Sequence, residues 1–97
     1  MYTILWSNIE EAFPLKVRIL LFAAYRERVG QGELYMDLPD DATVATLANA
    51  MSAHYPMLTD NPKSLVVAVN HEYSDHDHSL EDGDEAAFIP PVSGGSL

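Results

Sequence analysis

The residues best suited to chemistry lie near the C-terminal end, where residues 88–97 read FIPPVSGGSL. Glycine has no side chain, so Gly94 and Gly95 can pass through a narrow channel and turn freely. Pro90 and Pro91 cannot continue a sheet ladder, and they stiffen the base of this tail, which lowers the entropy lost on docking. Such a tail can deliver a terminal carboxylate into the active site of another protein. We therefore place the reactive group at the carboxylate of Gly95.

Two further residues, Ser96 and Leu97, follow Gly95. While a peptide bond joins Gly95 to Ser96, Gly95 has no carboxylate to activate. Three interpretations are open: a processing protease removes Ser96 and Leu97, the two residues are foreign to the natural chain, or this chain has lost the chemistry. We favour removal by a protease.

Other candidate sites are weaker. His76 and His78 would share one face of an extended segment, and imidazole with neighbouring carboxylates suits zinc. Two such ligands do not complete a tetrahedral site, so we interpret this polar stretch as a solvated loop and expect no metal. Ser93 lacks the strand-turn-helix setting of a hydrolase nucleophile. Gly94 and Gly95 lack the lysine and the length of a phosphate-binding loop.

Charge and length limit the function. The chain has 97 residues, enough for one domain, and a formal net charge of −10. Such a field repels nucleic acid and anionic membranes, and it steers the chain toward a protein partner with a basic face. Solubility alone is the other interpretation of this charge.

Cysteine is absent from the sequence. Disulfides, thiolate metal sites and cysteine nucleophiles are therefore excluded, and any sulfur must be carried on another group. No apolar run is long enough to span a bilayer, and the first residues lack the basic start of a signal peptide. We expect a cytoplasmic protein.

Hydrophobic periodicity predicts the elements that position the tail. An apolar run at residues 16–24 predicts a strand, with Val17, Ile19 and Leu21 on one face and Leu20 and Phe22 on the other. Further strands are predicted at residues 33–38, 65–70 and 85–89, with a short one around Tyr73, and a helix from an N-cap at Thr43 to Pro56. This order predicts an α+β fold of the β-grasp type, a mixed sheet packed on one main helix.

The segment DGDEAAFIPPVSGG at residues 82–95, with ILLFAAYRERVG near the start and AVNHEY in the middle, resembles the small subunit of molybdopterin synthase, a ubiquitin-like sulfur carrier. The resemblance covers residues 16–97. It divides the chain into an N-terminal extension at 1–15, a β-grasp domain at 16–91 and a tail at 92–97. In the extension, Ile4, Leu5, Ile9, Ala12 and Phe13 could form one apolar stripe of a short helix. A disordered or wrongly assigned start is the alternative.

The resemblance implies the chemistry. In the family an E1-like activating enzyme uses ATP to adenylate the terminal glycine, and sulfur then replaces AMP to give a thiocarboxylate. The large subunit of the synthase uses that sulfur to build molybdopterin, so the small subunit donates sulfur without catalytic side chains or a resident cofactor. A carrier for thiamine, cysteine or tRNA thiolation is an alternative, as is a ubiquitin-like interaction module that is never charged.

A sheet covered by one helix leaves its other face open to a partner. Phe22 and Ile89 are our candidates for contacts there, and Pro90, Pro91 and Val92 are candidates where the tail begins. Arg26, with Arg28, could orient the activating enzyme or the large subunit. The alternatives are ordinary sheet packing for the two apolar residues and local ion pairs with Glu27 or Glu33 for the arginines.

Overall fold

Alternating apolar residues form the first two strands. The computed structural model describes residues 13–90, beginning just before β1, Leu15–Leu21. Odd-numbered residues of β1 are buried and the even-numbered ones face outward. Beside it runs β2, Glu33–Leu38, antiparallel and in register from the pair Leu15–Leu38 to the pair Leu20–Glu33. The strand predicted at residues 33–38 is confirmed.

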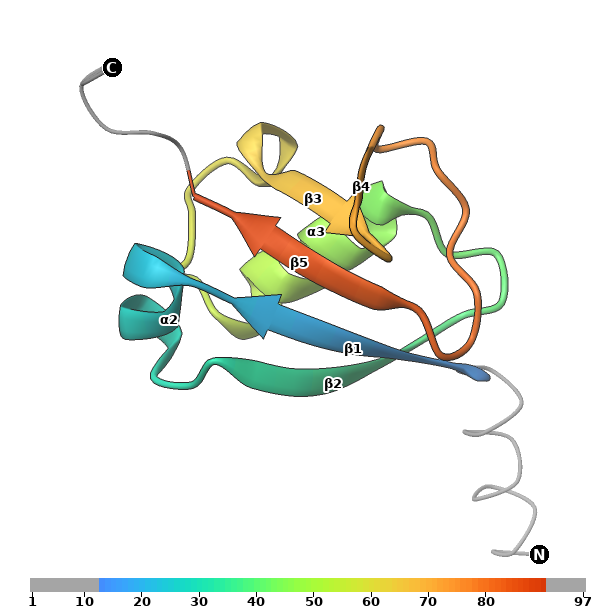
Figure 1. The fold of residues 1–97 in the computed structure, drawn as a ribbon, viewed down its shortest axis with the longest axis horizontal. Coiled ribbons are helices and arrows are strands. Elements are labelled where there is room, and N and C mark those ends of the chain that lie inside the picture. The colour runs from blue at the N-terminus through green and yellow to red at the C-terminus, as the bar shows by residue number, and fades with distance from the viewer. Residues whose placement is uncertain (1–12, 91–97) are drawn as a thin grey trace, which may run out of the picture.

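The later strands complete a mixed sheet with the order β2-β1-β5-β3-β4 (Figure 1). The last strand, β5 at Glu85–Ile89, inserts parallel to β1. On its other side lies β3, Val66–Val69, antiparallel, followed by the short edge strand β4, Glu72–Ser74. The predicted strand order along the chain is confirmed.

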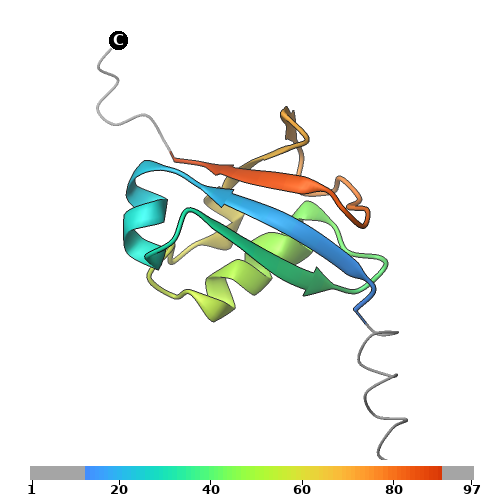
Figure 2. The ribbon, with the colours of Figure 1, turned by 60° about the horizontal axis from the view of Figure 1, so that its bottom comes forward.

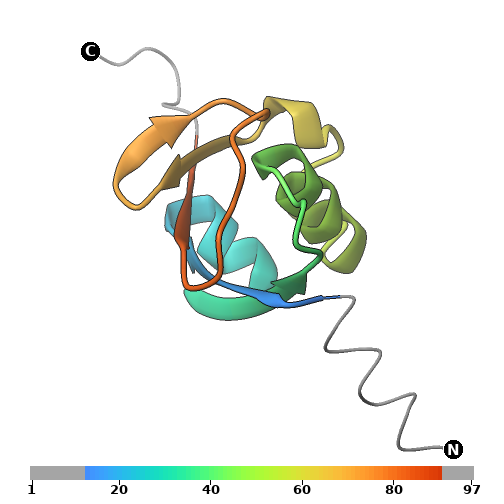
Figure 3. The same ribbon diagram turned by 90° about the vertical axis from the view of Figure 1, so that its right-hand side faces the viewer.

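The main helix, α3 at Val44–His54, lies across one face of the sheet, which curves around it (Figure 3). Thr43 caps its N-terminus: the Thr43 side chain accepts a hydrogen bond from the Thr46 backbone N–H, and the Thr46 hydroxyl accepts one from the Thr43 N–H. The buried stripe of α3 meets the odd-numbered residues of β1 in one core. That stripe consists of Val44, Leu47, Ala48 and Met51. The predicted helix and its cap at Thr43 are confirmed, and the helix ends at His54, two residues before Pro56.

The strand predicted at residues 16–24 ends earlier than expected. β1 stops at Leu21, and a second helix, α2 at Ala23–Val29, fills the connection to β2. Phe22 is the N-cap of α2, and the next residue, Ala23, has a positive φ of 47° that turns the chain out of the sheet. Gly30, with a φ of 92°, ends α2 in the left-handed conformation. The apolar run therefore forms a strand, then the N-cap and the first two residues of a helix.

The remaining connections are short. A single 3-10 turn, Pro62–Ser64, precedes β3, and its N-cap Asn61 accepts a hydrogen bond from Lys63 N–H. Asn70 and His71, with φ of 51° and 75°, form the tight turn between β3 and β4. Within residues 13–90, no helix is long and apolar enough to cross a membrane.

The positive φ of Ala23 predicts the effect of glycine at this turn. A Cβ in the left-handed region costs about 1 kcal/mol, so Ala23→Gly should raise the free energy of unfolding by roughly 0.5–1 kcal/mol. The matched control is Ala53→Gly in α3, which should lower it by about 0.5–1 kcal/mol. Urea unfolding with unchanged m values measures both changes. Equal destabilisation by the two variants would contradict the left-handed conformation of Ala23.

Candidate functional site

The sheet face opposite α3 carries an apolar surface. Figure 2 shows α3 against one side of the sheet, with no described helix on the other. Strand register places Leu20, Ala87, Ala68 and Tyr73 in one row across four strands. We call this surface the open face and define its apolar part by seven residues: Leu20, Phe22, Val66, Ala68, Tyr73, Ala87 and Ile89. Phe22 is 47% exposed and Val66 46%, so apolar side chains remain available to a partner.

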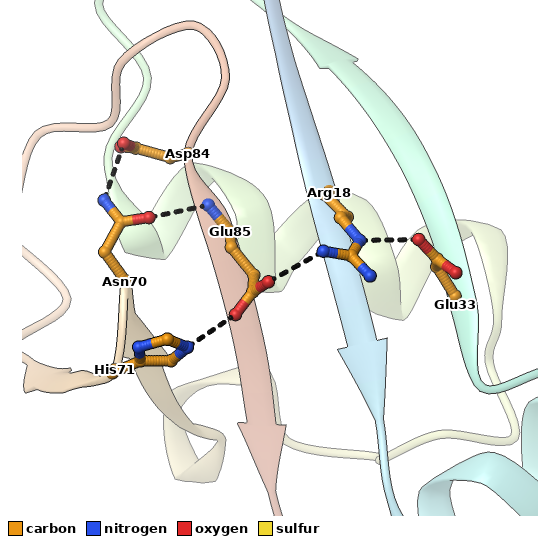
Figure 4. A network of polar contacts seen from close by, with 6 residues as sticks. All are labelled: Arg18, Glu33, Asn70, His71, Asp84 and Glu85. Carbon is orange, nitrogen blue, oxygen red and sulfur yellow. Dashed lines mark hydrogen bonds and ion pairs between the residues drawn. The ribbon is translucent and has the colours of Figure 1, made fainter.

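A charged network lies on the next part of the same face (Figure 4). The Arg18 guanidinium donates from Nε to Glu33 and from Nη1 to Glu85, the latter at 2.9 Å. His71 Nε2 lies 3.2 Å from the other oxygen of Glu85. Arg18 therefore joins β2, β1 and β5 across the face, and its single positive charge is shared by two carboxylates.

The amide of Asn70 fixes one end of this network. Its Nδ2 donates to Asp84 Oδ1 at 2.9 Å, and its Oδ1 accepts from the Glu85 backbone N–H at 3.0 Å. The Asn70 N–H in turn donates to the Glu85 carbonyl. Sequence reasoning missed this cluster, because Asn70 contacts Asp84 and Glu85, which lie 14 and 15 residues farther along the chain.

Arg18 stays charged throughout the neutral range. The hydrogen bond to Glu33 raises the pKa of Arg18 above its ordinary value, and the charges of Glu33 and Glu85 add to this. Because the pKa of Arg18 is raised in the folded state, its contribution to stability is fully present below the pKa that this group has in the unfolded chain. That contribution is lost only as the pH rises through the folded value.

The chain leaves the sheet beside Phe22. Leu21 of β1 pairs with Phe88 of β5, so Phe22 and Ile89 come next at the same end of two neighbouring strands. In Figure 1 this end of β5 lies on the side of the molecule where α2 lies. Pro90 is half-buried and is the last described residue. The predicted contacts Phe22, Ile89 and Pro90 are therefore brought together, while Pro91, Val92, Gly94 and Gly95 lie outside the described residues.

The two arginines of α2 differ in their contacts. Arg28 Nη1 donates to the Leu58 carbonyl at 3.1 Å, and its guanidinium lies 5.9 Å from the centre of the Tyr25 ring. The Arg26 side chain lies over Gly32, where an added Cβ would come within 3.1 Å of its Nε. Neither arginine forms an ion pair with a carboxylate among residues 13–90, and Glu33 pairs with Arg18 instead. The local ion pairs considered for these arginines are therefore wrong.

A family model connects this geometry to known proteins. The model of the ThiS family matches residues 19–95, which is most of the chain. The chain belongs to the ThiS family. The match begins inside β1 and ends at Gly95, so it includes the whole later sheet and both glycines of the tail.

Two relatives of this ThiS-family chain share one name. A protein of Dictyostelium discoideum named molybdopterin synthase sulfur carrier subunit is 40% identical, and the alignment covers 80% of this chain and 94% of that protein. The protein of the same name from Escherichia coli K12 is 38% identical, with 81% and 99% covered. The crystal structure of SAMP1 from Haloferax volcanii superposes with a TM-score of 0.72 at 31% identity, covering 82% and 99%. The predicted resemblance and the β-grasp fold are confirmed.

The histidine segment has a structural role in this ThiS-family chain. His76 Nε2 lies 2.8 Å from the Leu65 carbonyl, and the His76 and His78 carbonyls accept from Ala45 and Val44 at the start of α3. These contacts hold the loop after β4 against the helix. Among the described residues, no group of three His, Cys, Asp or Glu is placed to hold a metal ion.

The different contacts of the two arginines predict different costs of removal. Arg28→Met loses the hydrogen bond to Leu58 and the contact with the Tyr25 ring, so it should lower the free energy of unfolding by about 1–2 kcal/mol. Arg26→Met, the matched control, should change it by less than about 0.5 kcal/mol. Chemical denaturation measures both. A larger loss for Arg26→Met would show that Arg26 holds α2 in place.

Proposed function

We propose that this chain is the sulfur carrier subunit of molybdopterin synthase and that it carries sulfur on the carboxyl group of Gly95. The single observation that carries the proposal is the family match that runs through β5 and ends at Gly95. The names of the relatives from Dictyostelium discoideum and Escherichia coli support molybdenum cofactor synthesis rather than another sulfur pathway.

The proposed chemistry occurs on the tail and not on a side chain. After Ser96 and Leu97 are removed, the Gly95 carboxylate attacks the α-phosphorus of ATP in an E1-like enzyme, and pyrophosphate leaves. A hydrosulfide ion then attacks the acyl carbon of the adenylate and displaces AMP, and loss of the proton on sulfur leaves a thiocarboxylate. ATP is thus a substrate of the activating enzyme, and we expect no resident cofactor here. A cytoplasmic location fits this supply of ATP.

The open face is the proposed contact with the large subunit. Its apolar part includes Ile89 at the end of β5, and Pro90 follows directly and begins the path to the tail. A partner seated on this row therefore meets the start of the tail without any rearrangement of the sheet. The Arg18 network borders the row and contains no unpaired carboxylate at Glu33 or Glu85, which lowers the cost of covering it.

Arg26 is the proposed contact with an acidic group of a partner near the tail. It is exposed, it makes no ion pair within residues 13–90, and it lies on α2 next to Phe22. Because its guanidinium is not engaged by a carboxylate of its own chain, it can form an ion pair with a partner without breaking an internal one.

The requirement for a free Gly95 carboxylate predicts that adenylation depends on the residue at which the chain ends. Incubated with ATP and the activating enzyme, a chain ending at Gly95 should release pyrophosphate and form the adenylate, and the chain ending at Leu97 should not. With a sulfur donor present, intact mass spectrometry should show the Gly95 chain heavier by the replacement of oxygen with sulfur.

The matched control is a chain ending at Gly94, which has the same folded domain and a tail one residue shorter. It should release much less pyrophosphate than the chain ending at Gly95. If the chain ending at Gly95 is never adenylated, the chain is better explained as a ubiquitin-like interaction module that is never charged with sulfur. If the full chain ending at Leu97 is charged directly, the processing step is wrong.

The proposed contact at the open face predicts that one added charge there weakens binding of the large subunit. Ala87→Asp places a carboxylate in the middle of the apolar row, and an uncompensated buried charge of this kind costs about 2 kcal/mol or more, roughly a thirtyfold loss of affinity for the large subunit. Ala53→Asp, on the exposed side of α3, adds the same charge and should leave affinity unchanged. Isothermal titration calorimetry measures both. Equal affinities would place the contact elsewhere.

A further inference from the structure

We propose that the outer edge of β2 binds an extended basic segment of a partner protein, which adds to the sheet as one more strand. This edge is separate from the apolar part of the open face, to which β2 contributes no residue. The proposal therefore does not depend on the proposed function, and both surfaces can be occupied at once.

The strand β2 pairs with the sheet on one side only, because it lies at the outside of the sheet (Figure 1). The Leu21 N–H donates to the Gly32 carbonyl at 2.9 Å, so these two residues are a hydrogen-bonded pair. Every second pair of an antiparallel ladder is of this kind, and the register then gives Leu34 and Met36 the same bonds to β1. The residues between them point their N–H and C=O groups away from β1.

Three residues of β2 thus present backbone groups along the outer edge. They are Glu33, Tyr35 and Asp37, whose N–H and C=O groups have no hydrogen-bond partner within residues 13–90. At the other edge of the described sheet, β4 has three residues, against six in β2, so β2 offers the longer edge. An extended segment placed beside β2 would exchange hydrogen bonds with all three residues.

The core is incompletely covered at the same edge. Leu34 and Met36 lie opposite buried residues of β1 and so face α3, yet both are only half-buried. Leu38 of the same strand, by contrast, is 3% exposed. Ala50 of α3 is likewise half-buried against this core. An added strand would place alternate side chains beside Leu34 and Met36, and apolar residues there would extend the core.

The charges along this edge favour a basic segment. Glu33 shares the single positive charge of Arg18 with Glu85, so negative charge remains there. Asp37 is in no ion pair within residues 13–90, although Lys16 lies opposite it on β1. Basic side chains opposite Glu33 and Asp37 are therefore complementary to the edge. The net charge of −10 disfavours a second copy of this chain as the occupant.

A short peptide tests the contact. Placed antiparallel to β2, acetyl-Lys-Val-Thr-Ile-Arg-amide has its basic residues opposite Asp37 and Glu33, and its threonine opposite Tyr35. Its valine and isoleucine lie opposite Met36 and Leu34. In NMR spectra of the full chain, the backbone amide signals of Glu33, Tyr35 and Asp37 should shift most, because their N–H groups gain acceptors. The control peptide, with glutamate at both ends, should bind about tenfold more weakly.

Removal of single backbone donors distinguishes an added strand from simple charge attraction. N-methylation of the peptide threonine removes the N–H that would donate to the Tyr35 carbonyl, and it should weaken binding about tenfold. N-methylation of the valine is the matched control, because that N–H would face away from β2, and affinity should be unchanged.

A substitution in the protein tests the other side of the same pair. Tyr35 is 59% exposed, and proline is tolerated where a strand N–H faces solvent. Tyr35→Pro removes the outward donor and should weaken binding of the basic peptide about tenfold. Tyr35→Thr keeps that donor and should bind the peptide within about threefold of the parent chain. Circular dichroism checks the folding of both variants, and the N-methylated peptides decide the question if Tyr35→Pro does not fold.

Four results would overturn the proposal. Equal affinity of the two N-methylated peptides would show that no strand is added, and equal affinity of the basic and acidic peptides would show that charge does not select the segment. Amide shifts centred on β4 or on the open face, or no binding at millimolar peptide, would show that the edge of β2 is not the site. Shifts at β2 that depend on protein concentration without peptide would assign the edge to a second copy.

Discussion

The parallel pairing of β1 with β5 is the constraint on which the rest of the molecule depends. It brings together residues that are far apart in the sequence, with Arg18 opposite Glu85 and Leu21 opposite Phe88. Because the two strands run in the same direction, both end at the same side, and the chain leaves β5 beside the start of α2. An antiparallel arrangement would send the tail away from Phe22. The position of the tail is thus a consequence of topology.

The same alternation along the strands serves two purposes. Odd-numbered residues of β1 pack with α3, and Ile19 and Val17 are completely buried. The intervening residues form the open face, where Arg18 joins three strands and Leu20 begins the apolar row. A shift of one residue in register would exchange the two faces and destroy both the core and the open face. Core packing therefore also determines which side chains a partner meets.

Local sequence patterns predicted those structural features that depend only on residues close together in the chain. The helical stripe after Thr43, the strand at residues 85–89 and the ending at Gly95 were all found from the sequence. The end of β1 was not, because the positive φ of Ala23 has no residue-type signal and serves the packing of Tyr25 into the core. The partners of Arg18 were also missed, since Glu85 lies 67 residues away and only the sheet brings it close. The assignment of Gly94 and Gly95 as site residues rests on the sequence and the family match alone.

Charge is unevenly distributed, and this matters for a chain of net charge −10 that is proposed to approach ATP. Near the end of β5, Arg26, Arg28 and Lys63 are interspersed with Glu27 and Asp60. The turns at the opposite end of β1 are acidic and include Asp40, Asp41, Asp82 and Asp84. A uniform negative field would repel the triphosphate as the tail enters the activating enzyme. Concentrating the carboxylates at the far end reduces that repulsion where the tail begins, and it leaves the acidic end to orient the carrier toward a basic partner.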